Sequence, residues 1–477
     1  PIIVRSSSFL EDGFGHPFAG KYRSEFCPNQ GSPDERLEGL LRAVKRVYAS
    51  ALSPSALSYR RRHDLAEPDE QMAILVQRVA GGRYQRFHLP TIAGVAFSRD
   101  LYPWSERIDP NRGLVRLVFG LGTRAVDRVE DYPRMVALSH PALRPESDDQ
   151  VALYSQHWVD LIDLEANRLV SLPLAEVLAD RDYPGLNLLV SEMREGFPYD
   201  PPGNFLRAAP RDLVLTFNGL IRRTNLIATL DAILFRLEKA YGQPVEIEFA
   251  GHLAPDRRVC VDLLQCRPMA LPLPMPGWAS EAFTADIPAE RVLFQSERMA
   301  GSGLVHDIRY IVYIDPRAYG DLDAERQHGL GRLVGRLNAH PRLQEGTVMM
   351  MGPGRWGSSN IALGVRVTFA DIDSTAVLVE VAREEAGQLP EVSFGTHFFQ
   401  DLVEGDVIYM PVYPDQAASR YAEEFFREAP SILTDLAPAA AAYEGVLKVI
   451  DVARAAGGRL AHVAADPTAR RAICYLE

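Results

Sequence analysis

The sequence is poor in cysteine, and it has no long apolar run. Its 477 residues include four cysteines, none in a C-x-x-C pair, so neither a disulfide framework nor a cysteine-based zinc site is expected. No apolar run approaches the roughly 18 residues of a membrane-spanning helix. These absences favour a soluble, cytoplasmic protein with no membrane partner.

Positive charge is also scarce. Fifty-one Lys and Arg residues stand against 63 Asp and Glu residues, for a formal net charge of -12, which argues against a nucleic-acid partner that needs a strongly basic face. Only four of the basic residues are lysines. A phosphate-binding site in this chain would therefore rely mostly on arginine guanidinium groups.

The remaining composition predicts a mixed α/β protein. Hydrophobic residues make up 47% of the chain, and the length suits two or three domains. Helical spacing is predicted over 34–52 and in a long pattern from Asp212 that ends at Gly242 and Pro244. Period-two or β-rich segments predict strands over 72–79, 91–97, 113–119, 245–250 and 259–267.

Proline marks the clearest domain boundary. We expect a first domain over 1–270, a Pro-rich linker over 271–290 and a second α/β module over 291–415. The tail, 416–477, is expected to be helical as far as Gly457 and to close with strands over 460–463 and 473–476. The chain opens on a strand-like run, Pro1 to Val4, which suggests that an upstream segment is missing.

The most specific chemical pattern is Val245-Glu246-Ile247-Glu248-Phe249. Strand alternation places both carboxylates on one face. Neighbouring carboxylates repel unless a cation neutralises them, and Mg2+ prefers such oxygen ligands beside phosphate. The returning strand, Leu264-Gln265-Cys266-Arg267, adds an amide oxygen and a cation. The alternative is a solvated hairpin face with a salt bridge.

The opening loop is a second candidate. Arg5-Ser6-Ser7-Ser8 and Phe18-Ala19-Gly20-Lys21 combine small residues with two cations between a strand and a helix. Such a loop can direct backbone N–H groups, hydroxyls and the Lys21 ammonium at a polyphosphate. The same composition also suits ordinary turns.

The second module contains two weaker patterns. Gly352 to Asn360 is a Gly-dense loop that could hold an anion on Arg355 or stack a ring on Trp356, and the alternative is a Gly-rich corner with Trp356 in the core. Gly395-Thr396-His397 places an imidazole where it could act as a general base or a transient phosphate carrier. A buried core role for His397 is the alternative.

In order, these motifs resemble the nucleotide-binding domain of pyruvate phosphate dikinase and phosphoenolpyruvate synthase. The resemblance covers residues 1 to about 270 and rests on Val4-Arg5-Ser6-Ser7-Ser8, Glu11-Asp12, Phe18-Ala19-Gly20, Val76-Gln77-Arg78-Val79, Ala93-Gly94-Val95-Ala96-Phe97-Ser98, Gly120-Leu121-Gly122, Glu246-Ile247-Glu248-Phe249 and Leu264-Gln265-Cys266-Arg267-Pro268. Beyond residue 290 the chain more loosely resembles the C-terminal extension of uncharacterised proteins assigned pyruvate or phosphoenolpyruvate binding by homology.

The resemblance implies an ATP-grasp fold that binds ATP between two α/β subdomains, with Mg2+ held by the carboxylate hairpin. It implies that Arg5 contacts the phosphates and Arg267 steadies the γ-phosphate. Gln77 and Val79 would flank the adenine hinge. The ribose and the metal would face three hairpin residues, Glu246, Glu248 and Gln265, of which Glu248 and Gln265 are the expected metal ligands.

The chain also departs from the family pattern. Glu246 stands where the family usually has Asp, and the upstream Gly-Gly-Lys-Gly loop is absent. So are a Gly-rich phosphohistidine segment and a pyruvate-binding barrel. We therefore expect an ATP- and Mg2+-dependent phosphotransferase of the dikinase type with a small-molecule acceptor that the sequence does not name, involving Arg267, Arg355 and His397 in catalysis. A non-catalytic nucleotide-binding regulator or scaffold is the alternative, and the oligomeric state stays open.

Overall fold

The chain folds into two compact units. The computed structural model describes residues 1–8, 22–53, 56–57, 60, 71–100, 103–105, 107–126, 132–179, 183, 185–201, 208–269, 287–301, 303–358, 361, 364–383, 392–393, 397–405, 407–416, 420–466 and 470–477. The first unit comprises Pro1–Ala56 with Glu67–Met269, and the second comprises Leu57–Ala66 with Ala270–Glu477. The expected Pro-rich linker lies almost entirely outside the described residues.

A three-stranded sheet covered by one helix opens the first unit. Its strand order is β2 (Glu25–Cys27), β1 (Ile2–Ser8) and β3 (Met72–Arg78). The helix α1 (Pro33–Ser50) begins at a capping box between Ser32 and Glu35. It confirms the predicted helix.

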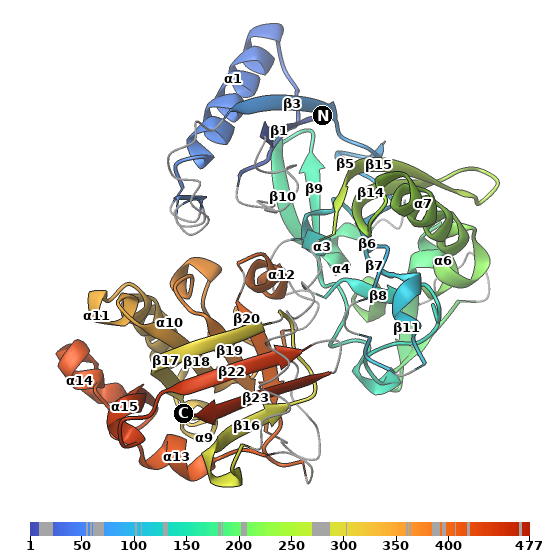
Figure 1. Cartoon of the computed structure of the whole chain (residues 1–477). Helices are drawn as coiled ribbons and strands as arrows, with labels where there is room; N and C mark the ends of the chain where they lie inside the picture. Colours follow the sequence, from blue (N-terminus) through green and yellow to red (C-terminus); the bar gives the residue numbers. More distant parts are fainter. Residues whose placement is uncertain are drawn as a thin grey trace. The chain divides into compact units, whose positions relative to one another are not determined.

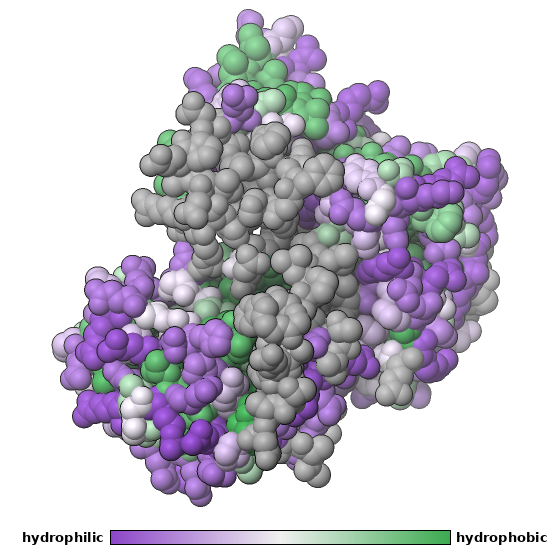
Figure 2. Space-filling view, viewed as in Figure 1, coloured by the Kyte–Doolittle hydropathy of each residue, from purple (hydrophilic) through white to green (hydrophobic). Residues whose placement is uncertain are grey.

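Only part of the apolar surface of α1 faces the sheet. Ala43 and Val47 are buried against Val4 of β1, whereas Leu37 and Leu41 are exposed. At 100° per residue the apolar residues span about half of the helix circumference, which is more than one sheet face covers. Figure 2 shows the resulting hydrophobic surface at the top of the view, where α1 lies in Figure 1.

An antiparallel five-stranded sheet forms the centre of the first unit. Its order is β15 (Val259–Pro268), β14 (Val245–Leu253), β6 (Ile92–Phe97), β7 (Leu114–Val118) and β8 (Arg134–Ala137). One face packs against α7 (Leu226–Tyr241), which lies beside β14 in Figure 1. As predicted, α7 ends at Gly242, whose φ of 71° suits glycine.

Two smaller sheets and several short helices complete this unit. One sheet has the order β10 (Arg168–Pro173), β9 (Trp158–Asp163), β5 (Phe87–Leu89) and β4 (Gly82–Tyr84), and the other has β12 (Phe197–Tyr199), β11 (Val190–Arg194) and β13 (Leu213–Leu215). The short helices are α3 (Thr123–Val126), α4 (Leu174–Val177), α5 (Leu186–Leu189) and α6 (Asn218–Arg223). The prediction of continuous helix from Asp212 is wrong at β13, because Leu213–Leu215 pair with β11 and are buried there.

The second unit is built on one large sheet. Its order is β16 (Val292–Ser296), β23 (Arg471–Leu476), β22 (Ala461–Asp466), β17 (Gly303–Ile314), β18 (Thr347–Pro353), β19 (Val377–Val381) and β20 (Ile408–Val412), and β21 (Leu447–Asp451) also pairs with β17. Strands β17 to β20 are parallel, so their carboxyl ends lie at one edge.

The helices of the second unit are mostly short. They are α9 (Pro316–Gly320), α10 (Ala324–Asn338), α11 (Pro341–Gln344), α12 (His397–Glu404), α13 (Glu423–Glu428), α14 (Leu433–Leu436) and α15 (Val452–Ala455). The expected closing strands form as β22 and β23. The helical prediction as far as Gly457 is wrong at β21, which is drawn into the sheet by pairing with β17.

Candidate functional site

The hairpin of β14 and β15 carries the two predicted carboxylates. Val245, Ile247 and Phe249 are buried in the core on one face, and Glu246 and Glu248 alternate onto the other. The side chains of Glu246 and Glu248 are only 10% and 22% exposed. This face of the hairpin is therefore not freely solvated.

Arg5 joins the two predicted metal ligands. Its Nη2 donates to Oε1 of Gln265 at 2.7 Å and to Oε2 of Glu248 at 3.1 Å. Because both oxygens contact the same nitrogen, they converge on one point. Strand β1 thereby places a guanidinium group, itself 19% exposed, against the carboxylate hairpin.

The second carboxylate has a different cation. Nη2 of Arg267 donates to Oε1 of Glu246 at 2.8 Å, and the two residues are register partners across the hairpin. Glu248 is likewise the partner of Gln265. A β-bulge follows immediately after this second pair, and such bulges redirect side chains beside functional sites.

Strand β3 carries the predicted adenine hinge. Gln77 pairs with Ile3 of β1, and the backbone N–H of Val79 donates to the carbonyl of Pro1 at 3.2 Å. Ala80, the next residue, packs against the apolar cluster that includes Val95 of β6. Because Val95 is the register partner of Glu248, the end of the hinge lies over the carboxylate face of the sheet. Within the described residues, neither Gln77 nor Val79 forms a hydrogen bond with the hairpin itself.

Part of the opening loop falls outside the part of the chain that the structure describes. Lys21, Glu11, Asp12 and the stretch 18–20 lie outside the described residues. The predicted phosphate contact of Lys21 therefore stays a prediction.

The Gly120-Leu121-Gly122 segment forms a tight turn between β7 and α3. Gly120 has a φ of 95°, and an added Cβ would lie 2.7 Å from the carbonyl oxygen of Asp160. The carboxylate of Asp160 accepts from Oγ1 of Thr123 at 2.8 Å and from Nε of Arg124 at 3.0 Å. Asp160 of β9 thus holds the first residues of α3 in place.

Sequence reasoning missed Arg116, a buried cation of β7. It is register partner of Val95, which in turn pairs with Glu248, so all three lie on the same face of the sheet. Arg116 is 3% exposed, and its guanidinium carbon lies 5.3 Å from the ring centroid of Phe97. The signal in the sequence was a single charge inside the apolar run Leu114-Val115-Arg116-Leu117-Val118.

The donor chemistry of the hairpin fits the predicted Mg2+. Glu248 and Gln265 offer a carboxylate and an amide oxygen that converge on a position already held by positive charge. Mg2+ commonly uses one or two carboxylates together with phosphate oxygens. Within the described part of the chain, no group of three or more His, Cys, Asp or Glu side chains could hold a metal. Oxygens from a nucleotide would have to complete the coordination.

The predicted residues of the second unit lie at the carboxyl ends of β18 and β19. Arg355 follows β18 and is half-buried, and Trp356 is fully buried, so its ring belongs to the core rather than to a ligand platform. His397 begins α12, and its side chain lies outside the described atoms. A Cβ on Gly357 would lie 2.4 Å from the ring of Phe398. The Arg355 loop therefore meets the start of α12.

A buried carboxyl group, which sequence reasoning missed, holds this region together. Glu380 of β19 is fully buried and accepts from the backbone N–H of Trp356 at 2.8 Å and of Ser393 at 2.7 Å. The hydroxyls of Ser393 and Tyr409 donate to it at 2.5 Å each. Burial raises the pKa of Glu380 to about 7 despite these donors. The signal was one acid in the apolar strand Val377–Val381.

Comparison with known proteins identifies the first unit. Residues 1–272, more than half of the chain, match the pyruvate phosphate dikinase AMP/ATP-binding domain. No curated protein matches the chain. The described helices are all too short or too polar to cross a bilayer. The match confirms the resemblance drawn from the ordered motifs and the expectation of an α/β chain with an ATP-grasp-like nucleotide-binding module. The chain belongs to the pyruvate phosphate dikinase AMP/ATP-binding domain family.

Proposed function

We propose that the chain is an ATP- and Mg2+-dependent phosphotransferase of the dikinase type. The observation that carries this proposal is the convergence of Arg5, Glu248 and Gln265 in an AMP/ATP-binding domain. A guanidinium beside two oxygen donors can exchange its protein partners for phosphate oxygens. Phosphoryl transfer depends mainly on positioning and on neutralising such charge.

The residues of the site have separable roles in this proposal. Arg5 and Arg267 bind phosphate oxygens, because their guanidinium groups match these oxygens in geometry and charge. Gln77 and Val79 border the adenine. Glu248 and Gln265 would hold the Mg2+, which when bound would neutralise negative charge on the phosphates. Glu246 orients Arg267 through their 2.8 Å ion pair and faces the ribose.

The acceptor site is proposed for the second unit. Arg355 would bind an anionic small-molecule acceptor, and His397 would take a proton from its hydroxyl or carry the phosphoryl group. The contact between the Gly357 backbone and Phe398 supports this pairing, because it brings the Arg355 loop beside the start of α12.

If His397 acts in the active site, His397→Ala should abolish transfer while leaving ATP binding and folding intact. Normal transfer in the folded variant would end this assignment.

One observation favours a second candidate function. Arg5 already forms an ion pair with Glu248, so the negative charge of this carboxylate is balanced by the protein itself. A protein that binds a nucleotide without transferring its phosphate, as a regulator or scaffold, would need no more than this.

ATP binding and turnover test the proposal together. The melting temperature of the full chain is measured with ATP and MgCl2, with ATP and EDTA, and without nucleotide. At a hundredfold over Kd, binding should add roughly 2.7 kcal/mol to the free energy of unfolding. Arg5→Gln should reduce this shift, and Arg112→Gln, which alters an exposed ion pair with Asp231, should not.

The products decide between the two candidates. Nucleotides are resolved after incubation with a metabolite mixture, and an enzyme forms AMP or ADP in amounts that exceed the protein. ATP binding without any product would support the regulator or scaffold. No ATP-dependent rise in melting temperature would contradict both.

A further inference from the structure

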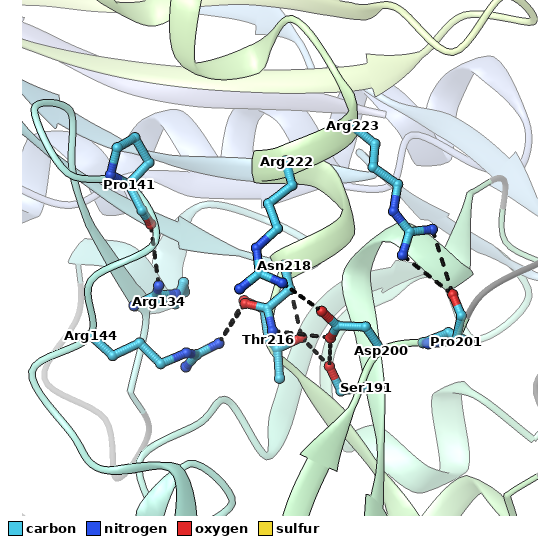
Figure 3. A network of polar contacts seen from close by, with 10 residues as sticks. All are labelled: Arg134, Pro141, Arg144, Ser191, Asp200, Pro201, Thr216, Asn218, Arg222 and Arg223. Carbon is cyan, nitrogen blue, oxygen red and sulfur yellow. Dashed lines mark hydrogen bonds and ion pairs between the residues drawn. The ribbon is translucent and has the colours of Figure 1, made fainter.

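Three arginine side chains lie together in the first unit, on elements that carry none of the predicted nucleotide contacts. Arg134 opens β8, Arg144 lies in the loop after β8, and Arg222 lies on α6. Figure 3 shows these three side chains side by side, whereas Arg223 turns toward the carbonyl of Pro201. The group Arg134, Arg144 and Arg222 is called the arginine cluster below.

The arginine cluster lies on the opposite face of the sheet from the carboxylate site. The register aligns Met135, through β7 and β6, with Glu248. Successive residues of a strand alternate between faces, so Arg134 points to the other side. An anion bound there would be separate from a nucleotide bound at Glu248.

Two members of the arginine cluster have acidic partners. Nη1 of Arg144 donates to Glu146 at 2.6 Å, and Nη1 of Arg222 donates to Oδ2 of Asp200 at 3.1 Å. Asn218 links the two pairs, since its amide nitrogen donates to Asp200 at 3.0 Å and its amide oxygen accepts from Arg144 at 3.0 Å (Figure 3). These contacts orient the two guanidinium groups.

Arg134 has no acidic partner among the described residues. It is 5% exposed, and its Nη atoms donate only to the backbone carbonyls of Met135 at 2.7 Å and Pro141 at 3.5 Å. Its Nε is buried with no hydrogen-bond partner. A buried charge without a counter-ion destabilises a fold, and buried cations are usually paired or bind ligands.

Among the described residues, the charges around Arg134 leave an excess of positive charge. Burial, followed by the charges of Arg144 and Arg222, lowers the pKa of Arg134 to about 9, and Glu146 opposes this shift. The group stays cationic at neutral pH. Three guanidinium groups thus face the carboxylates of Glu146 and Asp200, and Arg223 adds a fourth cation at the border of the cluster.

We propose that the arginine cluster binds a phosphate group, either as free phosphate or as part of a phosphorylated metabolite. A phosphate group brings about -1.5 to -2 charges and three acceptor oxygens, which match the excess charge and the planar guanidinium groups. Arg222 is 57% exposed, so one member of the arginine cluster is open to solvent. This inference does not depend on the proposed phosphotransferase function.

Titration with inorganic phosphate tests the site in the full chain. Binding is measured by calorimetry and melting temperature at constant ionic strength, with chloride as the replaced anion. The same titration in Arg5→Gln weakens any contribution from the nucleotide site. We expect saturable phosphate binding in both proteins, and a loss of affinity of tenfold or more in Arg134→Met and in Arg222→Gln.

Controls separate a binding role from a structural one. Arg112→Gln removes an exposed arginine of the same unit and should leave phosphate affinity unchanged. Arg134→Met should be at least as stable as the wild type without phosphate, because it removes a buried charge that has no acidic hydrogen-bond partner among the described residues. If it does not fold, Arg222→Gln, an exposed position, still tests the site.

Two results would overturn the proposal. One is phosphate affinity within twofold of the wild type in Arg134→Met or, where that variant does not fold, in Arg222→Gln. The other is the absence of saturable phosphate binding in Arg5→Gln, which would mean that any phosphate occupies the nucleotide site.

A parallel titration with a sugar phosphate identifies the source of the ligand. Tighter binding of the sugar phosphate assigns the site to a phosphorylated metabolite, and tighter binding of inorganic phosphate assigns it to the free ion.

Discussion

Charged side chains within otherwise apolar strands mark the polar sites of this protein. Glu248 on β14, Arg116 on β7 and Glu380 on β19 each interrupt a run of buried hydrophobic residues. Burial of a charge is costly unless it is paired or hydrogen-bonded. Glu248 meets the guanidinium group of Arg5, and Glu380 meets four donors, so neither carboxyl group lies against the apolar core alone.

The two carboxylates of the hairpin should respond differently to substitution. Glu248→Gln removes the charge that faces Arg5 and the proposed metal, so ATP-dependent turnover should fall by orders of magnitude while the fold survives. Glu246→Gln weakens the less exposed ion pair, with Arg267, and should lower stability by about 1–3 kcal/mol with a smaller loss of turnover. Turnover and thermal unfolding are measured on both variants. Equal, small effects on turnover would mean that the hairpin has no catalytic role.

At the scale of elements, Glu380 joins β19 to the loop after β18, to the segment before α12 and to β20. The loop after β18 contributes the Trp356 N–H, the segment before α12 contributes Ser393, and β20 contributes Tyr409. Burial lifts the pKa of Glu380 from its ordinary value of 4.5 to about 7. The fold therefore favours the protonated carboxyl group.

This pKa gives a pH dependence with a definite sign. An acid whose pKa is raised by folding contributes its stability fully below pH 4.5, and this contribution decreases as the pH rises to about 7. Glu380→Gln removes this titrating group, so the difference in free energy of unfolding between wild type and variant should shrink as the pH rises over this range. Urea unfolding at several pH values measures this difference. A difference that stays constant with pH would show that Glu380 does not titrate there.

At the scale of the whole molecule, the two units have separate hydrophobic cores. Leu230 of α7 belongs to the core of the first unit, and Leu333 of α10 is fully buried in the second. Each core provides its own burial of apolar surface. Calorimetry of the full chain should therefore resolve two unfolding transitions. ATP with Mg2+ should raise the midpoint temperature only of the transition that belongs to the first unit.

Matched core substitutions assign the transitions. Leu230→Ala should lower the midpoint temperature of the transition that responds to ATP, and Leu333→Ala should lower that of the other transition. Each substitution should reduce the free energy of unfolding of its unit by about 2–5 kcal/mol. If either substitution moves both transitions equally, the units do not unfold independently.

Local sequence signals determined many of the elements and the chemistry of the hairpin. The helix α1, the end of α7 at Gly242 and the strands β14 and β15 follow from capping residues, turn residues and alternation, which act over a few neighbouring positions. The two faces of β14 follow for the same reason. The ordered motifs also predicted the family that the comparison of residues 1–272 confirmed.

Tertiary structure alone decided which cation meets which acid. Arg5 and Glu248 are 243 positions apart, and no local pattern determines that β1 delivers a guanidinium group to the hairpin. The helix predicted over the residues of β21 does not form. The pairing of this strand with β17, more than a hundred residues away, overrides the local preference. The surroundings of Arg134 are another such case, because whether it meets an acidic partner within the described residues depends on every segment that packs around it. Alternation and turns are properties of neighbours, whereas charge pairing and strand order result from contacts between distant parts of the chain.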